Sequence, residues 1–398
     1  MLLVEKHVIN RNNRYFKEID NLCFKAKNLY NYANYLIRQS FIFEQKYLSY
    51  NVIQKLCQDT VDYKALPAKV SQQILIRLHE AWQGFFNCIQ SYRENPKKFF
   101  SPPGLPRYLD KTKGNFPCIY TNQAISKKYL KKFIVNPSKT SILIKTKINQ
   151  IRQARLVPKS NYYVFEVIYE REEISPQYSS NNVAGIDIGL NNLAAVTSNL
   201  KGFQPLLING RPLKKINAYY HKKRSVLQSK LFKKQKTSST IRKITNKRNF
   251  KIDDYLHKAS RLVINYLAAN QIGTMVIGHN DKWKQSINLG KRNNQTAVAP
   301  LGETPRPHCL NFVSIPFNRF ISMLKYKAEL IGIKVIITEE SYTSKCSFID
   351  SESLCKQSNY KDRRVKRGLF RSQSGILINA DCNGSGNIIR KVVQDGFC

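Results

Sequence analysis

The sequence has few acidic residues. Only 26 Asp and Glu stand against 66 Lys and Arg among 398 residues, which gives a formal net charge of +40. A compact body with this excess of positive charge repels itself, so a polyanion is its natural counterpart. The 22 Tyr and 20 Phe are scattered through the basic segments, where they suit base stacking beside phosphate contacts. The composition therefore predicts a protein that binds nucleic acid.

Long apolar runs are also missing. The start, MLLVEKHVINRN, lacks the uninterrupted apolar segment of a secretory signal, and no stretch approaches a membrane span. We therefore expect a cytoplasmic, nucleoid-associated protein without a membrane partner. In that compartment the nine cysteines should be mostly reduced thiols. None of them forms a CxxC pair, so the zinc-ribbon pattern is absent from the sequence.

The first half of the chain predicts strands with helices between them. Residues 2–9 have the look of a strand, and apolar residues at three- and four-residue spacing predict long helices over 11–37 and 68–92. Period-two segments follow at 132–135, 141–145, 153–157 and 162–169. The simplest assembly is a small β-barrel of residues 1–10 and 96–180, closed by the N-terminal strand, with a helical block, 11–95, inserted. Such barrels often bind oligonucleotides.

The second half alternates strand and helix. Residues 274–277 and 334–338 read as buried strands and 317–331 as a helix, which predicts an α/β layer with a mainly parallel or mixed sheet. Residues 214–251 read as one long basic helical segment with few acids to pair its charges, so we expect it to track phosphates. The residues that we expect to bind nucleic acid there are Lys222, Lys223, Arg224, Lys233 and Lys234.

Two stretches far apart in the sequence carry candidate catalytic carboxylates. In VAGIDIGLNNLAAV (183–196) an apolar strand is interrupted by Asp187, and a turn leads into a second strand. From this stretch alone, an Asp hydrogen-bonded to its own turn is equally compatible. In GILINADCNGSGNIIR (375–390) Asp381 follows another apolar run and precedes a helix-like segment. Two such acids suggest carboxylates that converge on one site, because a buried charge is costly unless it is paired or binds a metal.

Phosphodiester hydrolysis is a reaction in which such acids would take part as metal ligands. Two Mg²⁺ ions activate a water, stabilise the reacting phosphorus and stabilise the leaving oxygen. Mg²⁺ prefers hard oxygen ligands, which Asp187, Asp381 and a Glu at the end of the 334–338 strand can supply. The six histidines show no HxH or HExxH spacing, which argues against tyrosine- or zinc-based chemistry.

Several motifs together resemble a known family. GIDIGLNNLAAV, TEESYTSK (338–345) and NADCNGSGNI (379–388) look like the three signature regions of TnpB, transposon-encoded proteins related to type V CRISPR effectors. The resemblance extends to LPAKVSQQILIRL (66–78) and to the basic segment. It implies an RNA-guided DNA endonuclease of mixed α/β fold. Such a protein has a wedge-type β-barrel with an inserted helical recognition lobe, and an RNase H-like RuvC nuclease domain, here 181–398.

The resemblance also implies partners. The guide would be an RNA from the transposon end, and the target a double-stranded DNA beside a short transposon-adjacent motif. The sequence leaves the oligomeric state open.

One departure from the family pattern concerns the catalytic Glu. In most of the family it ends the strand that reads TMVIGHN here, and this chain has Gly278 in its place. Glu339 and Glu340, after the next strand, can supply the acid. We favour Glu340 as the third catalytic and metal-binding residue, because the family pattern has Glu, one residue and then Tyr-Thr-Ser. Since a strand alternates its faces, only one of the pair can point inward, and Glu339 stays the alternative.

A second departure concerns the zinc ribbon that the family usually places before the last Asp. Cys346 and Cys355 are the only cysteines in that interval. Two thiols cannot close a four-ligand structural zinc site, so no structural zinc is expected. We interpret 341–374 as a degenerate zinc-ribbon-like region and 347–373 as a metal-free basic loop that covers the active site or touches a nucleic-acid strand.

Two other functions stay open. One is a nuclease-inactive, RNA-guided DNA-binding protein that represses or marks its targets, which the missing Glu at Gly278 favours. The other is an accessory nucleic-acid chaperone of the transposon that uses no guide. Intact Asp187 and Asp381 argue for the active nuclease, because an inactive site has no need of metal ligands.

Overall fold

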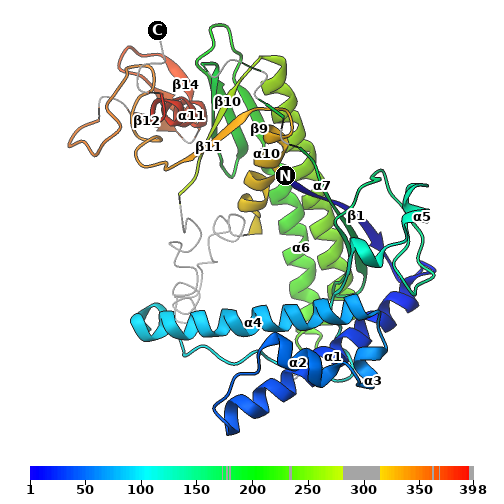
Figure 1. Cartoon of the computed structure of the whole chain (residues 1–398). Helices are drawn as coiled ribbons and strands as arrows, with labels where there is room; N and C mark the ends of the chain where they lie inside the picture. The colour runs from blue at the N-terminus through cyan, green and yellow to red at the C-terminus, as the bar shows by residue number, and fades with distance from the viewer. Residues whose placement is uncertain are drawn as a thin grey trace. The chain divides into compact units, whose positions relative to one another are not determined.

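The computed structural model describes residues 1–172, 174–175, 178, 181–232, 235–280, 314–360, 363–366 and 368–393. The chain divides into two compact units, Met1–Glu172 and Glu173–Cys398, and both contain helices and sheets (Figure 1). The mixed α/β prediction is therefore confirmed. Within the described residues, no helix is both long and apolar enough to cross a bilayer.

The first unit is built on a four-stranded antiparallel sheet. Its order is β1 (Leu2–Ile9), β6 (Tyr163–Glu170), β5 (Gln153–Pro158) and β2 (Cys118–Thr121). The short strands β3 (Ile134–Val135) and β4 (Ile144–Lys145) pair only with each other, after the one-turn helix α5 (Lys127–Leu130). Throughout residues 1–172, no ladder joins the end strands β1 and β2. The sheet is thus open, and the predicted closed barrel is not formed.

Four helices lie between β1 and β2 in the sequence. They are α1 (Phe16–Phe43), α2 (Tyr50–Cys57), α3 (Val61–Lys64) and α4 (Ala68–Glu94). The two long helices confirm the helical spacing, and their apolar stripes pack together around the fully buried Trp82. The indole of Trp82 donates a hydrogen bond to Asn34 Oδ1 of α1 at 3.0 Å, so the polar atom inside this core is satisfied. Short 3₁₀ turns follow at Pro96–Lys98 and Asn122–Ala124.

The second unit is built on a five-stranded mixed sheet of order β11-β10-β7-β8-β9. Strands β7 (Val183–Asp187), β8 (Asn192–Ser198) and β9 (Leu206–Asn209) form an antiparallel meander, as predicted for the hairpin around Asp187. Strand β10 (Thr274–Gly278) runs parallel to β7, and β11 (Lys334–Thr338) runs parallel to β10. The carboxyl ends of β7, β10 and β11 therefore meet at one edge of the sheet.

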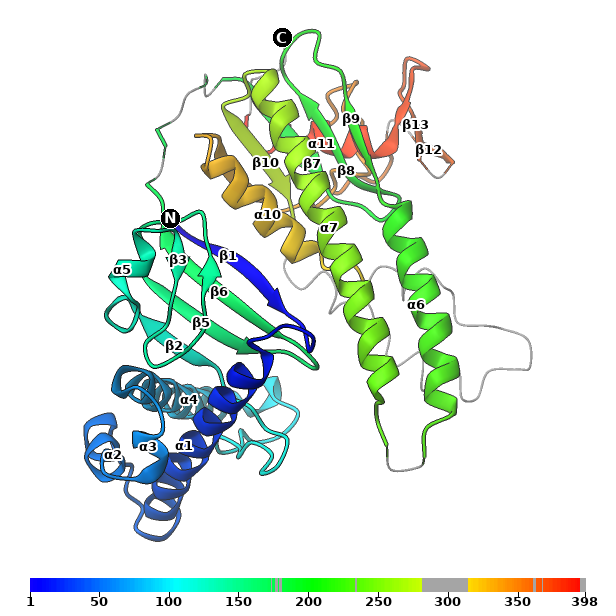
Figure 2. The ribbon, with the colours of Figure 1, turned by 90° about the vertical axis from the view of Figure 1, so that its right-hand side faces the viewer.

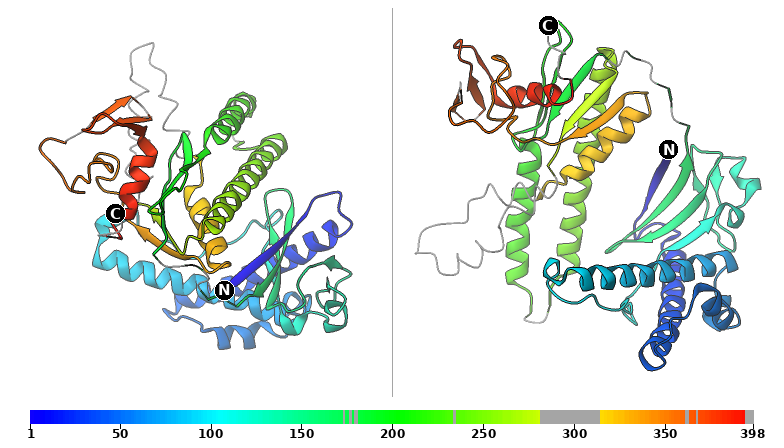
Figure 3. Two further views of the ribbon diagram at one scale, coloured as in Figure 1. Left: turned by 90° about the horizontal axis from the view of Figure 1, so that it is seen from above. Right: turned by 60° about the vertical axis from the view of Figure 1, so that its left-hand side comes forward.

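Helices cover both faces of this sheet. Helices α7 (Ser239–Ala269) and α10 (Phe317–Glu329) pack on the face that carries Ile186 and Ile277. Helix α11 (Ala380–Arg390) packs on the other face of the sheet (Figure 3). There Ile388 and Ile389 pack against Val183 and Val276. Because side chains alternate along a strand, Val183, Gly185 and Asp187 share the α11 face.

Two predictions for this unit were wrong in part. The basic segment 214–251 is not one helix but a hairpin of α6 (Arg211–Ser229) and α7, which lie side by side (Figure 2). Helix α7 begins where the side chain of Ser238 accepts a hydrogen bond from Ile241 N at 3.2 Å, a standard helix cap. The region interpreted as a loop contains β12 (Arg363–Lys366) and β13 (Leu369–Arg371), which form an antiparallel sheet with β14 (Leu377–Asn379).

Candidate active site

Asp187 is the last residue of β7, the central strand of the mixed sheet. Its carboxylate faces helix α11 at the point where that helix carries a glycine. A Cβ atom built on Gly384 would lie 2.7 Å from Asp187 Oδ2, closer than any real side chain allows. The small residues of NADCNGSGN therefore let α11 approach the sheet closely enough to meet the carboxylate.

Asp381 lies in the first turn of α11, and its position is fixed by two asparagines. Asn379 caps the helix, since its Oδ1 accepts hydrogen bonds from the backbone N–H groups of Asp381 (2.9 Å) and Cys382 (3.3 Å). Asn192 of β8 donates from Nδ2 to Asp381 Oδ2 at 2.8 Å. Arg364 of β12 lies farther away, with Nη2 3.8 Å from Asp381 Oδ1.

Glu340 follows β11 by two residues, on the face that Asp187 occupies in β7. The strand register pairs Gly278 with Thr338, so the chain beyond β11 passes next to Gly278. A Cβ built on Gly278 would lie 2.8 Å from both Cγ and Oε1 of Glu340, and 2.5 Å from Ile388 Cδ1. The side chain of Glu340 thus uses space that any residue other than glycine at 278 would need.

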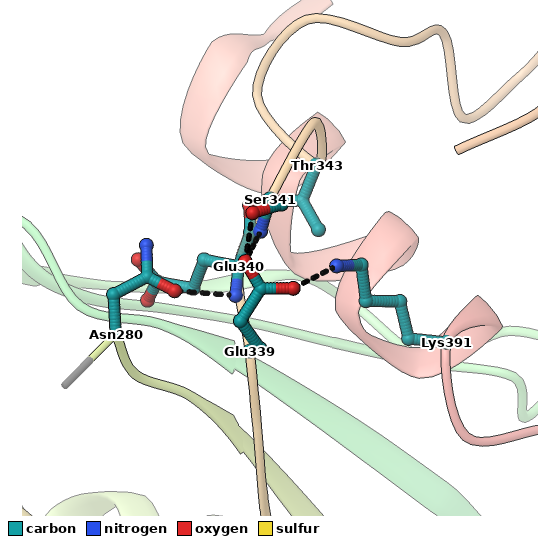
Figure 4. Close-up of polar contacts among 6 residues, drawn as sticks. All are labelled: Asn280, Glu339, Glu340, Ser341, Thr343 and Lys391. Atoms are coloured by element: carbon teal, nitrogen blue, oxygen red, sulfur yellow. Dashed lines mark hydrogen bonds and ion pairs between the residues drawn. The ribbon is translucent and has the colours of Figure 1, made fainter. Parts of the chain in front are cut away.

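The backbone around Glu340 is held by neighbouring polar groups (Figure 4). Its N–H donates to Asn280 Oδ1 at 2.9 Å, and its carbonyl accepts from Thr343 Oγ1, also at 2.9 Å. These contacts fix the turn, so the direction of the Glu340 side chain is set by the backbone and not by a partner of its carboxylate.

Glu339 points elsewhere. Its carboxylate accepts hydrogen bonds from the N–H and hydroxyl of Ser341 and forms an ion pair with Lys391 Nζ at 3.1 Å (Figure 4). The side chain is 61% exposed. Of the two adjacent acids, the structure therefore places Glu340, and not Glu339, beside Asp187.

The electrostatics link the three predicted acids. Burial, followed by the negative charges of Glu340 and Asp381, raises the pKa of Asp187 to about 8, while Arg364 opposes the rise. Burial, followed by the charge of Glu339, raises the pKa of Glu340 to about 7, and Lys391 opposes that rise. A cation bound near these carboxylates would offset their mutual repulsion.

The donor set fits a hard divalent cation. Glu340 Oε1 is buried and has no hydrogen-bond partner, an arrangement that is costly unless something positive binds there. The oxygens of Asp187, Glu340 and Asp381 are of the type that Mg²⁺ prefers. Among the described residues, however, no group of three Asp, Glu, His or Cys side chains is already gathered tightly enough to hold an ion.

The region before Asp381 is anchored by residues that the sequence analysis missed. Asn383 and Asn387 of α11 donate from Nδ2 to Cys346 O, at 2.9 and 2.7 Å. Cys346 is buried, and its thiol donates to Ser353 O at 3.3 Å, whereas Cys355 is exposed. Regularly spaced asparagines in NADCNGSGN, on a helix face otherwise formed by small residues, were the available signal.

A polar cavity of about 490 Å³ opens beside Asp381. Its lining includes Asn191 of the β7–β8 turn, Asn192 of β8, Arg211 and Arg364. In the sequence Arg364 is one of several cations in a basic segment, and its proximity to Asp381 depends on how β12 packs. Cationic and amide groups of this kind next to carboxylates are suited to hold a phosphodiester.

Three of the predicted nucleic-acid residues lie on α6. Lys222 and Lys223 are exposed on α6, whereas Arg224 is half-buried with its guanidinium 6.0 Å from the ring centre of Tyr220. Lys233 and Lys234 lie outside the described residues.

Two family models match the chain. Residues 166–284 match OrfB_IS605, described as a probable transposase, and residues 317–388 match the Cas12f1-like TNB domain. Together they cover the mixed sheet, the basic hairpin and the segment that carries Glu340 and Asp381.

Two curated relatives are similar in sequence. The CRISPR-associated endodeoxyribonuclease Cas12f2 of Micrarchaeota archaeon (strain CG1_02_47_40) is 28% identical over 258 residues, which cover 62% of this chain and 43% of the relative. The chain thus matches less than half of that protein's length. The TnpB-like protein ORF457 of Acidianus two-tailed virus is 22% identical over 417 residues, covering 95% of this chain and 84% of the viral protein.

Solved structures also align along most of the chain. A Cas12f1–sgRNA–target DNA complex aligns with a TM-score of 0.38 at 14% identity, covering 97% of this chain and 98% of that one. The mini-RNA-guided endonuclease CRISPR-Cas_phi3 aligns with a TM-score of 0.46 at 11% identity, covering 99% and 92%.

Proposed function

The chain is a TnpB-family protein, and from that premise we propose that it is an RNA-guided DNA endonuclease of an insertion sequence. It cleaves DNA next to a short transposon-adjacent motif, guided by an RNA from the transposon end. The observation that supports the proposal is that the charges of Glu340 and Asp381 act on the buried Asp187 at the carboxyl end of β7.

The second unit is, in this proposal, an RNase H-like RuvC nuclease domain. An antiparallel meander followed by two parallel strands, with helices on both faces, supports this assignment. So does the placement of the acids, because Asp187 ends the first strand and Asp381 begins the helix that packs against it. The first unit, with its sheet and inserted helices, takes the roles of wedge and recognition lobe.

Asp187, Glu340 and Asp381 would hold Mg²⁺ as the resident metal. When bound, two such ions activate a water and stabilise the charge that develops on the phosphorus centre and the leaving oxygen. Asn192 orients Asp381 through its hydrogen bond, and the Asn379 cap fixes the start of α11. Arg211 and Arg364, in the neighbouring cavity, are placed to bind the phosphodiester.

The third acid is relocated in this chain. Glu340 comes from the end of β11, one strand farther out than Gly278, and its side chain returns to the position beside Asp187 across the space left by the glycine. Gly278 therefore need not indicate an inactive site. A glycine at this point is what a carboxylate arriving from β11 requires.

The partners follow from charge and family. A net charge of +40 requires a polyanionic counterpart, and the relatives include proteins named as a CRISPR-associated endodeoxyribonuclease and as TnpB-like. A guide RNA and a double-stranded DNA target account for both observations.

One observation favours the alternative, a nuclease-inactive RNA-guided DNA-binding protein. Among the described residues the carboxylates are not gathered into a ready three-ligand site. In that case the protein would bind its target without cutting it.

Cleavage of a plasmid library with randomised flanks separates the two functions. The purified protein–RNA complex is incubated with the library and Mg²⁺, next to an Asp187→Asn complex. The proposal predicts cleavage beside one short motif and a loss of roughly a thousandfold or more in the variant. Motif-dependent binding without cleavage by the wild-type protein would establish the guided binder instead.

A further inference from the structure

The α6–α7 hairpin encloses a second cavity, of about 420 Å³, that is separate from the carboxylates. Its size lies within the roughly 300–1,000 Å³ range of small-molecule sites. Ile216 of α6 and Ile244 of α7 provide an apolar lining, and Tyr219 contributes an exposed aromatic ring. Tyr219 is 62% exposed, so most of its surface is open to solvent.

Four lysines surround this cavity. Lys215 and Lys223 come from α6, one four residues before Tyr219 and the other four residues after it. Lys247 and Lys251 come from α7 and are four residues apart. Residues four apart lie on one face of a helix, so both helices direct their lysines to the shared opening. Among the residues described as lining the cavity, none is acidic.

The lysines act on the tyrosine. The Lys223 ammonium lies 4.8 Å from the centre of the Tyr219 ring, within the range of a cation–π contact. A hydrogen bond from Lys223, aided by the charges of Lys223, Lys247 and Lys251, lowers the pKa of Tyr219. The ring thus lies in a strongly positive environment that still leaves most of its surface open.

The inner side of the cavity is rigid. Arg248 of α7 donates from Nε and Nη2 to Asn217 Oδ1 of α6, at 2.8 and 2.7 Å. The hydroxyls of Tyr220 and Thr245 form a further bridge between the helices at 3.0 Å. These contacts fix the spacing of the two helices, so the cavity exists before any ligand arrives and binding need not order it.

We infer that this cavity is a binding site for one unpaired nucleotide of a single-stranded nucleic acid, with its base stacked on Tyr219. The flanking phosphates bind the surrounding lysines. An open aromatic face combined with unpaired cations is the arrangement by which proteins bind single strands without reading their sequence. Paired bases offer no free face, so a duplex can meet the lysines but not the ring.

The inference deepens the proposed function and rests on it for the source of the strand. That source is either the guide RNA or a DNA strand displaced from the target, and the same base-plus-phosphate chemistry serves both.

Equilibrium binding by the full-length protein tests the site. Fluorescent 20-nucleotide probes of unstructured RNA, single-stranded DNA and duplex DNA are titrated in EDTA with protein freed of RNA. Tyr219→Ala should weaken binding of one or both single strands by about tenfold, the usual effect of losing one stacked base. Tyr219→Phe keeps the stacking ring and should stay within about twofold. The duplex should be bound equally by all three proteins.

The lysines have a matched control. Lys247→Ala removes a charge at the cavity, and Lys243→Ala removes one from an exposed position of the same helix outside the described lining. Lys247→Ala should weaken single-strand binding more than Lys243→Ala does. If only one of the two single strands responds to Tyr219→Ala, that strand is the source, and if both respond, the site accepts either.

The possible failures are distinguishable. If wild-type protein and Tyr219→Ala bind the single strands equally well, the inferred nucleotide site is refuted, while the nuclease proposal stands. An equal loss of duplex binding also overturns it, since the ring would then not contact an unpaired base. If wild-type protein binds none of the probes, the proposed function fails as well.

Discussion

The acids that join segments of the first unit differ in their surroundings from the candidate site acids of the second unit. In the first unit, Glu18 accepts hydrogen bonds from the N–H and hydroxyl of Ser141, at 2.8 and 2.5 Å. Asp20 accepts from the hydroxyl of Tyr163, and Glu170 from the guanidinium of Arg152. Each of these carboxylates joins two parts of the unit and has its partner within the protein.

In the second unit, the negative charges of Glu340 and Asp381 act on the buried Asp187 instead. The pKa values of Asp187 and Glu340 are raised to about 8 and about 7, and Glu340 Oε1 has no partner. Partners and pKa values therefore distinguish acids that stabilise the fold from acids that form a functional site. A carboxylate with a partner stabilises the fold, whereas buried carboxylates whose pKa values are raised by burial and by neighbouring negative charges cost stability and indicate a site.

Among substitutions that leave the three acids in place, replacing Gly278 should reduce cleavage the most. In Gly278→Ala the added methyl group would lie 2.8 Å from Glu340 Cγ and Oε1, so the carboxylate must move away from Asp187. We expect guided cleavage to fall by roughly 10–100-fold, as when a metal ligand loses its orientation, with RNA binding unchanged. Cleavage rates and RNA affinities of the two proteins provide the measurement.

A glycine of the first unit is the control. A Cβ on Gly84, within α4, would meet nothing within 4 Å. Gly84→Ala should therefore leave cleavage unchanged and stabilise the helix by about 0.5–1 kcal/mol. Equal activity of Gly278→Ala and wild type would show that Glu340 does not depend on this space.

A smaller effect should appear in the pH dependence of stability without metal. The pKa of Asp187 is raised from 3.8 to about 8, so the folded protein keeps a proton that the unfolded chain has released across this interval. The resulting stabilisation is present below about pH 4 and is lost as the pH rises toward 8. In EDTA, wild type should lose on the order of 2 kcal/mol more than Asp187→Asn between pH 5 and 8.

Melting temperatures of the two proteins, recorded across this pH range, would reveal the difference. If the melting temperatures of the two proteins changed equally with pH, the inferred repulsion among the carboxylates would be contradicted. Added Mg²⁺ should reduce the loss in wild type more than in the variant, because a cation favours the ionised carboxylates.

Much of the fold could be predicted from local patterns. The strand over 2–9, the two long helices of the first unit and the hairpin at Asp187 all follow from apolar periodicity, and the structure confirms them. The closed barrel was wrong because periodicity identifies strands but not their neighbours. The break between α6 and α7 was missed because residues 230–238 contain neither glycine nor proline.

The site was less accessible to sequence reasoning. Motifs could identify Asp187 and Asp381, and strand alternation could state that only one of Glu339 and Glu340 points inward. Whether Glu339 or Glu340 points inward depends on the register between β10 and β11 and on the path of the turn after β11. Asn192 and Arg364 both act through contacts with Asp381. Asn192 lies almost 200 residues before Asp381 in the chain and Arg364 almost 20 residues before it, so no local sequence pattern indicates either contact.

The most direct test of the account is to move the third acid between the two strands. Mg²⁺-dependent cleavage is measured for Glu340→Gln, Glu339→Gln and the exchange Gly278→Glu with Glu340→Gly. We predict a loss of about a hundredfold or more for Glu340→Gln, little change for Glu339→Gln, and partial recovery in the exchange. Full activity of Glu340→Gln, or a loss confined to Glu339→Gln, would contradict the assignment of Glu340 as the acid that completes the site.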